Sequence, residues 1–126
     1  MNSTTDFVSW FRSVTPYVNA FRGKTFVIGF SGEMVTDEKF VDFIHDINLL
    51  ASLGVRLVLV HGARPQIQLR LDESQLETQS IMGLRVTDPA ALQCVKESVG
   101  RVHHEIAAGL SMGLPNLPMA NAAIRV

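Results

Sequence analysis

Two short runs of almost continuously apolar residues, 25–30 and 55–60, predict β-strands. Both are rich in β-branched and aromatic residues and neither alternates with polar positions, a pattern typical of parallel strands covered on both faces. The order strand, helix, strand predicts a right-handed crossover and an α/β fold whose ligands bind at the carboxyl ends of the strands. The helix between the strands is predicted from apolar residues spaced by three and four: Phe40, Phe43, Ile44, Ile47 and Leu50.

Polar residues and a glycine mark where this helix should begin and end. Thr36 can act as its N-cap, which would place Asp37 and Glu38 in the first turn, beside the positive end of the helix dipole. Gly54 can adopt the left-handed conformation that ends a helix. Further along, the polar stretch 72–80 is expected to be a surface excursion.

A second helix is predicted to begin with Asp88 as N-cap and Pro89 at the first helical position. Gly113 and Pro115 should end it, before a connection and the start of a strand over residues 122–126. Its buried face is expected to carry Leu92, Val95, Val99, Val102 and Ile106.

The amino-terminal residues 1–22 predict a separate amphipathic arm. Pro16 should kink or break its helix, because the proline ring clashes with the carbonyl of Arg12. The apolar stripe of this arm either packs on its own domain or docks on another subunit. The stripe consists of Phe7, Trp10, Phe11, Val14, Val18 and Phe21.

Composition narrows the class of protein. The 126 residues carry 11 Lys and Arg against 12 Asp and Glu and contain no basic block, so neither nucleic acid nor an anionic membrane is an expected partner. No apolar run approaches the length of a membrane span and no export signal is visible, so a cytoplasmic location is expected. Cys94 has no partner for a disulfide and is expected to be a small buried residue without a catalytic role. His45, His103 and His104 lack metal-ligand spacing, and no metal is expected.

Three loops lie where an α/β sheet presents its ligand site: residues 29–33, 61–66 and 83–89. In the first two, small residues would let backbone N–H groups approach an anion, although tight turns also use glycine for steric reasons alone. In the third, Arg85 can present a planar fork to a carboxylate or form an ordinary surface ion pair.

Together these loops resemble the amino-acid kinase family, in its N-acetylglutamate branch, where the corresponding loops read Lys-Tyr-Gly-Gly, His-Gly-Gly-Gly-Pro and Gly-Leu-Arg-Val-Thr-Asp. The last motif is intact at residues 83–88. From about Phe7 to the final residue the chain resembles the N-acetylglutamate synthase family, through segments 16–17, 21–26, 32–34, 45–47, 57–66 and 111–115. The resemblance implies a carbamate kinase-like, three-layer sandwich with a mainly parallel sheet. Residues 23–126 would be the amino-terminal portion of that domain, incomplete here, and the kinked helix of residues 1–22 would precede it.

The chain departs from the kinase pattern at three positions. Gly29 stands where the kinases have a lysine, Ser31 replaces the first glycine of the pair, and Arg64 replaces the third glycine of the second loop. Because phosphoryl transfer depends on positioning and on stabilising charge, loss of the lysine disfavours an ATP-dependent kinase. Acetylglutamate kinase nevertheless remains an alternative because the 83–88 motif is intact, and the aromatic arm leaves a non-enzymatic oligomerisation module as another.

The resemblance implies that this domain senses L-arginine and forms a ring-like homo-oligomer through the arm. A separate domain, absent from this chain, would transfer acetyl from acetyl-CoA to glutamate, the first step of arginine biosynthesis. The chain itself would then have no catalytic residue and no cofactor. Tyr17 is the implied arginine contact, and the rest of that pocket would fall after Val126.

The resemblance also implies an anion or acylamino-acid site, inherited from the kinases. Its residues either still bind a ligand or are relics kept for loop geometry. They are Gly32, His61, Gly62, Ala63, Arg64 and Arg85.

Overall fold

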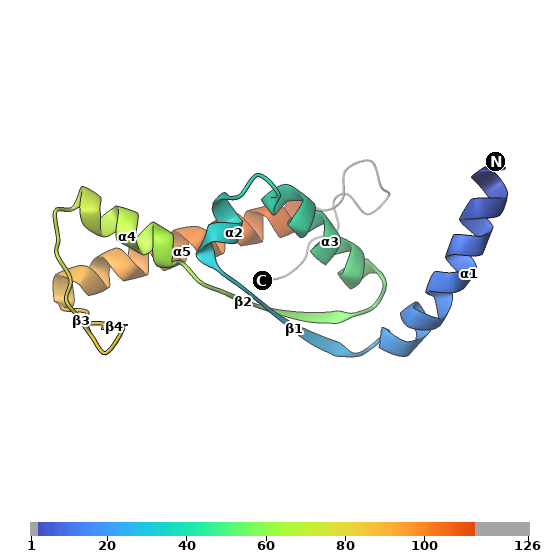
Figure 1. Ribbon diagram of the computed structural model, residues 1–126, viewed down its shortest axis with the longest axis horizontal. Helices are drawn as coiled ribbons and strands as arrows, with labels where there is room; N and C mark the ends of the chain where they lie inside the picture. The colour runs from blue at the N-terminus through green and yellow to red at the C-terminus, as the bar shows by residue number, and fades with distance from the viewer. Residues whose placement is uncertain (1–2, 113–126) are drawn as a thin grey trace.

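The computed structural model describes residues 3–112. The molecule is elongated, with a strand-and-helix body between an amino-terminal helix at one end and a small hairpin at the other (Figure 1). The expected helix end at Gly113 and Pro115 and the expected strand at 122–126 lie outside the described residues. In chain order the elements are α1 (Ser3–Phe21), β1 (Thr25–Phe30), α2 (Gly32–Thr36), α3 (Phe40–Ser52), β2 (Arg56–His61), α4 (Arg64–Glu73), β3 (Ser80–Ile81), β4 (Leu84–Arg85) and α5 (Pro89–Met112).

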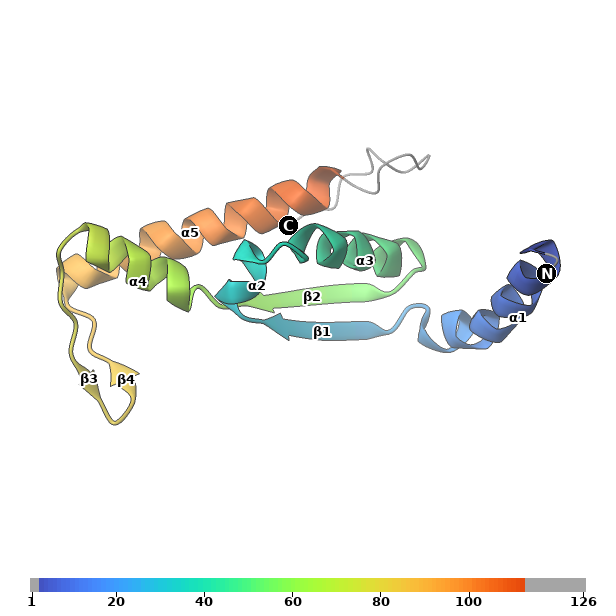
Figure 2. The same ribbon diagram turned by 45° about the horizontal axis from the view of Figure 1, so that its top comes forward.

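The two predicted strands form a parallel pair, from Thr25 opposite Arg56 to Phe30 opposite His61. This confirms the strand, helix, strand unit, with the second strand one residue later than predicted. Coverage on both faces was wrong for the described residues: exposure alternates along each strand, and Val27 is 69% exposed. The reason is visible in Figure 2, where α2, α3 and α5 all lie on the same side of the pair.

The main core lies between that covered face and the helices. Phe30 of β1 and Phe43 of α3 meet edge to face, with ring centroids 5.0 Å apart. Ile44 and Ile47 of α3 are buried, which confirms the stripe predicted for this helix. The buried members of the core are Val35, Ile44, Ile47, Ala63, Val102, Ile106 and Leu110.

The two ends of α3 differ in how well the sequence predicted them. Thr36 does not cap the helix; it belongs to the short α2, and its hydroxyl donates to the carbonyl of Glu33. The Asp37 carboxylate instead accepts the Lys39 N–H at 2.8 Å, just before the helix. Gly54 does end α3, with φ +88°, its N–H donating to Ala51 and that of Val55 to Leu50, a Schellman motif.

Helix α5 begins as predicted but buries a different face. The Asp88 carboxylate accepts the Ala91 N–H at 2.8 Å, and Pro89 is the first helical residue. Leu92 and Val99, expected inside, are exposed. The helix rests on α4 through its amino-terminal half and on α3 through its carboxyl-terminal half, so its buried residues are Ala91, Cys94, Ser98, Val102, Ile106 and Leu110.

Helix α1 continues through Pro16, so the proline does not break it. Figures 1 and 2 show that the axis of the helix bends. The hydroxyls of Ser13 and Thr15 donate to carbonyls one turn back, a pattern that favours helix bending. None of its residues is buried, and Trp10 is 59% exposed. The arm therefore does not pack into the core of the described part of its own domain.

The polar excursion is shorter than predicted. Asp72 and Glu73 belong to α4, and Ser80 opens an antiparallel hairpin that the sequence did not predict. Two consecutive left-handed residues, Met82 at φ +51° and Gly83 at φ +77°, make its turn. A second small core beneath the excursion contains Leu71, Ala91 and Cys94, so Cys94 is buried as expected.

Candidate functional site

The first two predicted loops meet at a close contact between backbones. The N–H of Gly62 donates to the carbonyl of Phe30 at 2.9 Å, and the side chain of Gln66 donates to the carbonyl of Gly32 at 2.7 Å. A methyl group on Gly32 would lie 2.9 Å from the Cα of Ala63 and would overlap the Gln66 side chain. The sequence analysis gave two reasons for these glycines, approach of an anion and steric need in a tight turn. The steric reason accounts for this contact.

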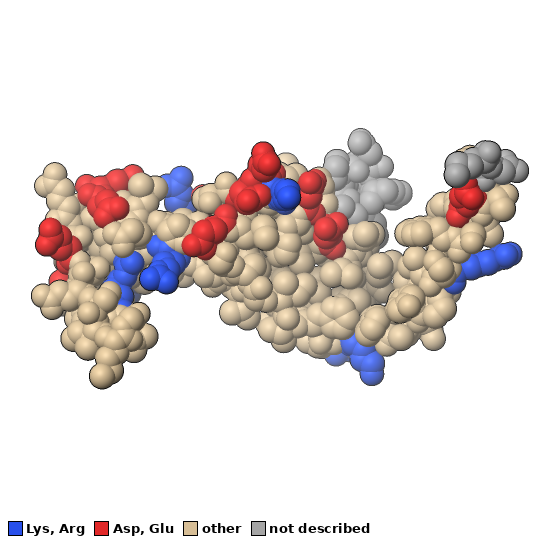
Figure 3. Space-filling view, viewed as in Figure 1, with Lys and Arg blue, Asp and Glu red and all other residues tan. Residues whose placement is uncertain are grey.

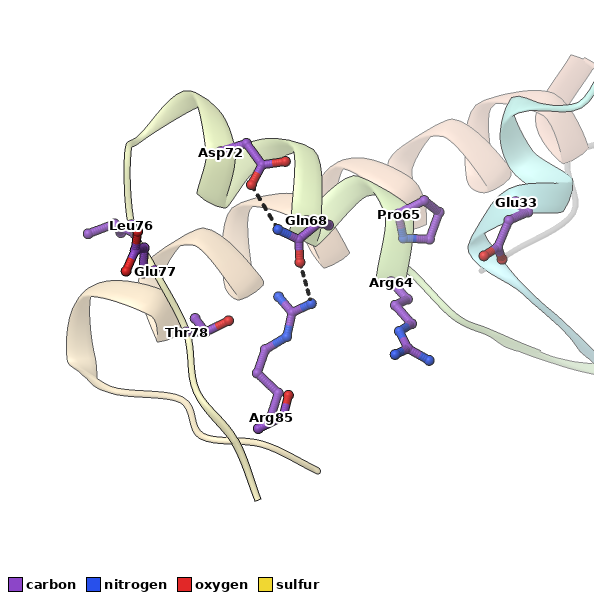
Figure 4. A pocket seen from close by; sticks show the side chains of 10 residues that line it. Glu33, Arg64, Pro65, Gln68, Asp72, Leu76, Glu77, Thr78 and Arg85 are labelled. Atoms are coloured by element: carbon purple, nitrogen blue, oxygen red, sulfur yellow. Dashed lines mark hydrogen bonds between the residues drawn. The ribbon is translucent and has the colours of Figure 1, made fainter. Parts of the chain in front are cut away.

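A groove of about 680 Å³ opens beside this contact, between α4 and the hairpin (Figure 4). It brings together Arg64, from the first turn of α4, and Arg85, from β4. Figure 3 shows basic side chains where α4 meets the hairpin, with acidic side chains near the outer end of α4 and over α2. The full lining is Glu33, Arg64, Pro65, Gln68, Asp72, Leu76, Glu77, Thr78, Ser80 and Arg85.

Within the described part of the chain, Arg85 does not form the surface ion pair considered from the sequence. Its Nη2 donates to Oε1 of Gln68 at 2.9 Å, and the Nε2 of Gln68 donates to a carboxylate oxygen of Asp72 at 2.8 Å. Its Nη1 is buried and has no hydrogen-bond partner among residues 3–112. Figure 4 shows the three side chains as one chain of contacts along the groove. Gln68 and Asp72 follow Arg64 at intervals of four residues, a helical spacing that could have identified them from the sequence.

Glu33 is a further groove residue that the sequence analysis did not select. Its pKa is lowered, first by a hydrogen bond from its own backbone N–H, then by the Ser31 hydroxyl and by the positive charge of Arg64. The carboxylate is thus ionised near neutral pH and faces the same groove as Arg64.

Of the predicted site residues, Arg64 and Arg85 line the groove, and the others lie outside its lining: Tyr17, Gly32, His61, Gly62 and Ala63. His61 is half-buried, with Nδ1 3.2 Å from the carbonyl of Gly62 and its ring centroid 6.1 Å from that of His103. Tyr17 is 66% exposed on α1, at the opposite end of the molecule from the hairpin (Figure 1). The predicted residues therefore do not form one constellation.

Gly29, where the kinases have a lysine, lies near the end of β1. The nearest neighbour of a methyl group placed there would be the carbonyl oxygen of Val60, at 3.9 Å. A methyl group would fit there without clash, so close packing around the Cβ position does not require a glycine. The position contributes no positive charge.

Across the described residues, no three or more histidine, cysteine, aspartate or glutamate side chains are grouped to hold a metal ion. Within residues 3–112, no helix has both the length and the apolar character needed to cross a bilayer.

Known proteins resemble the chain over nearly its whole length. An amino-acid acetyltransferase of Ralstonia nicotianae is 49% identical over 120 residues, covering 95% of this chain and 27% of that protein. Another, of Vibrio cholerae, is 48% identical over 123 residues, covering 98% of this chain and 28% of that protein. The chain thus spans little more than a quarter of the length of these relatives. The predicted resemblance is confirmed.

Two solved structures of N-acetylglutamate synthase from Neisseria gonorrhoeae share the fold. The one with coenzyme A and L-arginine has a TM-score of 0.74 and 32% identity, covering 88% of this chain and 26% of that chain. The one with coenzyme A and N-acetyl-glutamate has a TM-score of 0.71 and 35% identity, covering 82% of this chain and 24% of that chain.

These structures confirm the predicted fold class. The described residues form a part of that fold in which helices cover one face of the parallel strands. The sequence model of the amino acid kinase family matches residues 24–126, which include the parallel pair, both glycine loops and the hairpin. The chain belongs to the amino acid kinase family.

Proposed function

We propose that this chain is part of the arginine-sensing, oligomer-forming domain of an N-acetylglutamate synthase. A domain outside the chain would carry the chemistry: the amine of glutamate attacks the thioester carbonyl of acetyl-CoA, a C–N bond forms and the C–S bond breaks. Coenzyme A leaves as the thiol, taking up the proton that the amine loses. The observation that carries the proposal is the similarity of 95–98% of the chain to proteins named amino-acid acetyltransferase. Residues 1–22 would be the arm and residues 23–126 the kinase-like portion.

The alternative, an acetylglutamate kinase, is disfavoured by the groove and by Gly29. No charged side chain extends from position 29, and Arg64 and Glu33 line the opening with charges of opposite sign. A coupled assay of ADP release should therefore show no turnover with N-acetylglutamate and ATP, for the chain itself or for a longer protein that contains it. Rapid acetylglutamate-dependent turnover would overturn the proposal.

Arginine sensing is assigned to the arm through Tyr17. The exposed phenol ring can stack on a guanidinium, and its hydroxyl can hydrogen-bond to the ligand. The test is the acetyl-transfer rate of the longer protein with and without L-arginine. A Tyr17→Ala variant should lose the response to arginine, whereas Tyr17→Phe, which keeps the ring, should keep most of it. A response unchanged by Tyr17→Ala would exclude this residue as a contact.

The anion site is assigned to the groove and the loop contact beside it. Arg64 and Arg85 would supply charge for a carboxylate, and His61, Gly62, Ala63 and Gly32 the surrounding backbone. The alternative, a relic preserved for loop geometry, is favoured by the close contact at Gly32. A titration with a carboxylate ligand distinguishes the two interpretations: a working anion site binds the ligand, and a relic does not.

Self-association through the arm is favoured by a specific observation. Phe7 stacks near Trp10 and Phe11, with ring centroids 6.2 and 6.0 Å away, and all three rings are more than half exposed. An aromatic patch of this kind is typical of a protein interface, and a second copy of the chain would cover it. Changing Trp10 and Phe11 together to Ala should lower the mass measured by sedimentation, while Asn19→Ala on the same helix should not. An unaltered mass would exclude the arm as the contact.

A further inference from the structure

Three basic residues lie together where the strands of the parallel pair begin, at the end of the sheet opposite the glycine loops. The N–H of Gly23 donates to the carbonyl of Gly54 at 2.8 Å, and the N–H of Arg56 donates to the carbonyl of Lys24 at 2.8 Å. Arg22 lies over the same turn, with its Cγ 3.0 Å from a methyl group placed on Gly54. These contacts form a basic cluster of Arg22, Lys24 and Arg56.

The charge of the basic cluster is not compensated within residues 3–112. All three side chains are exposed, and none forms an ion pair with a described carboxylate. Figure 3 shows basic side chains gathered where α1 meets β1, on the side of the body away from the acidic side chains over α2 and α3. Like charges held together repel unless an anion lies against them. The basic cluster therefore favours an acidic partner.

The same molecule carries an acidic surface of matching charge. Four exposed acids follow one another from the end of α2 to the middle of α3: Asp37, Glu38, Asp42 and Asp46. With Lys39 among them, four acids less one lysine give a net charge of −3, equal in size to the +3 of the basic cluster. Asp42 and Asp46 are one turn apart and share a face of the helix. None of the four acids forms an ion pair within the described residues.

A second copy of the chain presents both surfaces at once. No ion pair joins the two surfaces within one molecule, so each is free to meet its complement on a neighbour. The whole chain has a formal net charge of only −1, so copies are not kept apart by a large total charge. A contact between two different surfaces leaves one of each free, and it therefore builds a closed ring or an open filament.

We propose that the basic cluster of one copy docks on the acidic surface of a second copy of this chain. Exposed ion pairs each add little affinity, and complementary charge mainly fixes orientation and speeds encounter. The contact thus sets the direction in which copies join, head to tail. It goes beyond the contact proposed for the arm and does not depend on it, because neither Trp10 nor Phe11 takes part.

The test reverses the charge of each surface separately. Lys24→Glu with Arg56→Glu makes both surfaces acidic, whereas Asp42→Lys with Asp46→Lys makes both basic. Each double variant alone should raise the dissociation constant for self-association of the 126-residue chain about tenfold, measured by sedimentation equilibrium at low salt. An equimolar mixture of the two should return to within about threefold of wild type, because acidic surfaces again meet basic ones.

Lys96→Glu with Arg101→Glu is the matched control. Both cations are exposed on α5, outside the two surfaces, and the net charge changes by the same amount as in Lys24→Glu with Arg56→Glu. Its dissociation constant should stay within about twofold of wild type. Sodium chloride at about 0.5 M should weaken association of wild type and change the reversed variants little. The thermal unfolding midpoint of every variant should stay near that of wild type, because all the changed residues are exposed.

The outcomes separate this inference from the arm contact. The charged contact is overturned if the reversed variants associate like wild type, if their mixture associates no better than either alone, or if wild type stays a single chain at low salt. A single wild-type chain that binds inorganic tripolyphosphate would identify a free polyanion as the occupant instead of a second copy. Loss of mass on changing Trp10 and Phe11, with no response to charge reversal, would sustain the arm contact alone. The reverse pattern would sustain this inference and exclude the arm.

Discussion

At the scale of single residues, the contact between the two glycine loops depends on one missing methyl group. A Cβ on Gly32 would lie 3.0 Å from Cδ of Pro65 and still closer to the backbone of Ala63. Backbone and ring atoms there cannot move aside as the end of a flexible side chain can. We expect Gly32→Ala to lower the free energy of unfolding by about 1–3 kcal/mol, measured by urea denaturation.

Gly100, inside α5, is the matched control for that substitution. No atom of the described residues outside its own helical turns lies within 4 Å of a methyl group placed on it. Gly100→Ala should therefore raise the free energy of unfolding by about 0.5–1 kcal/mol, because alanine is the better helix former. Equal effects at the two glycines would contradict the steric interpretation of the loop contact.

The sequence identified the residues of the groove only in part, for a physical reason. Arg64 and Arg85 stood out because their motifs resemble those of a known family. Gln68 carries no charge and belongs to no motif, and its importance comes from what lies on either side of it in space. The ion pair considered for Arg85 was wrong because an amide occupies the place where a carboxylate was expected.

At the scale of elements, α5 depends on its first turn. The carboxylate of Asp88 accepts the N–H of Ala91, which would otherwise lack a partner within the helix. Asp88→Ala should lower the free energy of unfolding by about 1 kcal/mol in urea denaturation. Asp88→Asn, whose side chain can accept the same bond, should lose no more than a few tenths, and a loss equal to that of alanine would point to charge instead of capping.

The prediction for the buried face of α5 was wrong because the most hydrophobic residues of its first half are not the buried ones. Where the helix crosses α4, its inward residues include the small Ala91, Cys94 and Ser98, which allow two helix backbones to approach. The larger Leu92 and Val99 therefore point outward. Only Val102 and Ile106 of the predicted stripe are buried, since that half of the helix lies against α3 and the main core. A single sequence does not show which neighbour a helix meets along its length.

The contact between α4 and α5 also includes an exposed ion pair, Arg70 to Glu97, with Nε and Oε2 2.8 Å apart. The hydrogen bond from Arg70, followed by one from Gln93, lowers the pKa of Glu97 below its ordinary value of 4.5. The stability that this carboxylate contributes is therefore present above pH 4.5 and is lost as the pH falls through the lower pKa of the folded state.

The corresponding prediction concerns Glu97→Gln. Wild type should be the more stable at neutral pH, and the difference should shrink towards zero under acid conditions, as measured by urea denaturation across a pH series. High salt should reduce the difference at neutral pH, because the pair is exposed. A difference that grows on acidification would contradict the assigned cause.

At the scale of the whole molecule, no element within residues 3–112 covers one apolar face of the parallel pair. The helices lie on one side of the pair (Figure 2), and the alternation of exposure along each strand puts three exposed valines on the other side: Val27, Val58 and Val60. Changing Val27 and Val60 to Thr should raise the solubility of the chain and reduce binding of an apolar dye, while the free energy of unfolding changes by less than about 0.5 kcal/mol, since threonine also favours strands. A large loss of stability would show that the face is covered in solution.

The overall fold was the most predictable level. The chain order strand, helix, strand leaves few topologies open, and the parallel pairing of β1 with β2 follows from it. The β3–β4 hairpin was not predicted because its turn uses Met82 in a left-handed conformation that methionine rarely adopts. Only two residues on each side form that ladder, too few for a hydrophobic pattern to reveal.

Helix α5, with 24 residues, is about 36 Å long and is held at two places. Its carboxyl-terminal half is seated on α3, and its amino-terminal end follows directly from the hairpin beside the groove. A rigid rod of this length acts as a lever. The far end lies about 26 Å from the α3 seat, so a tilt of about 5° there displaces that end by about 2 Å, close to the H···O distance of one hydrogen bond. Disturbance of the α3 seat would therefore arrive at the groove mechanically amplified.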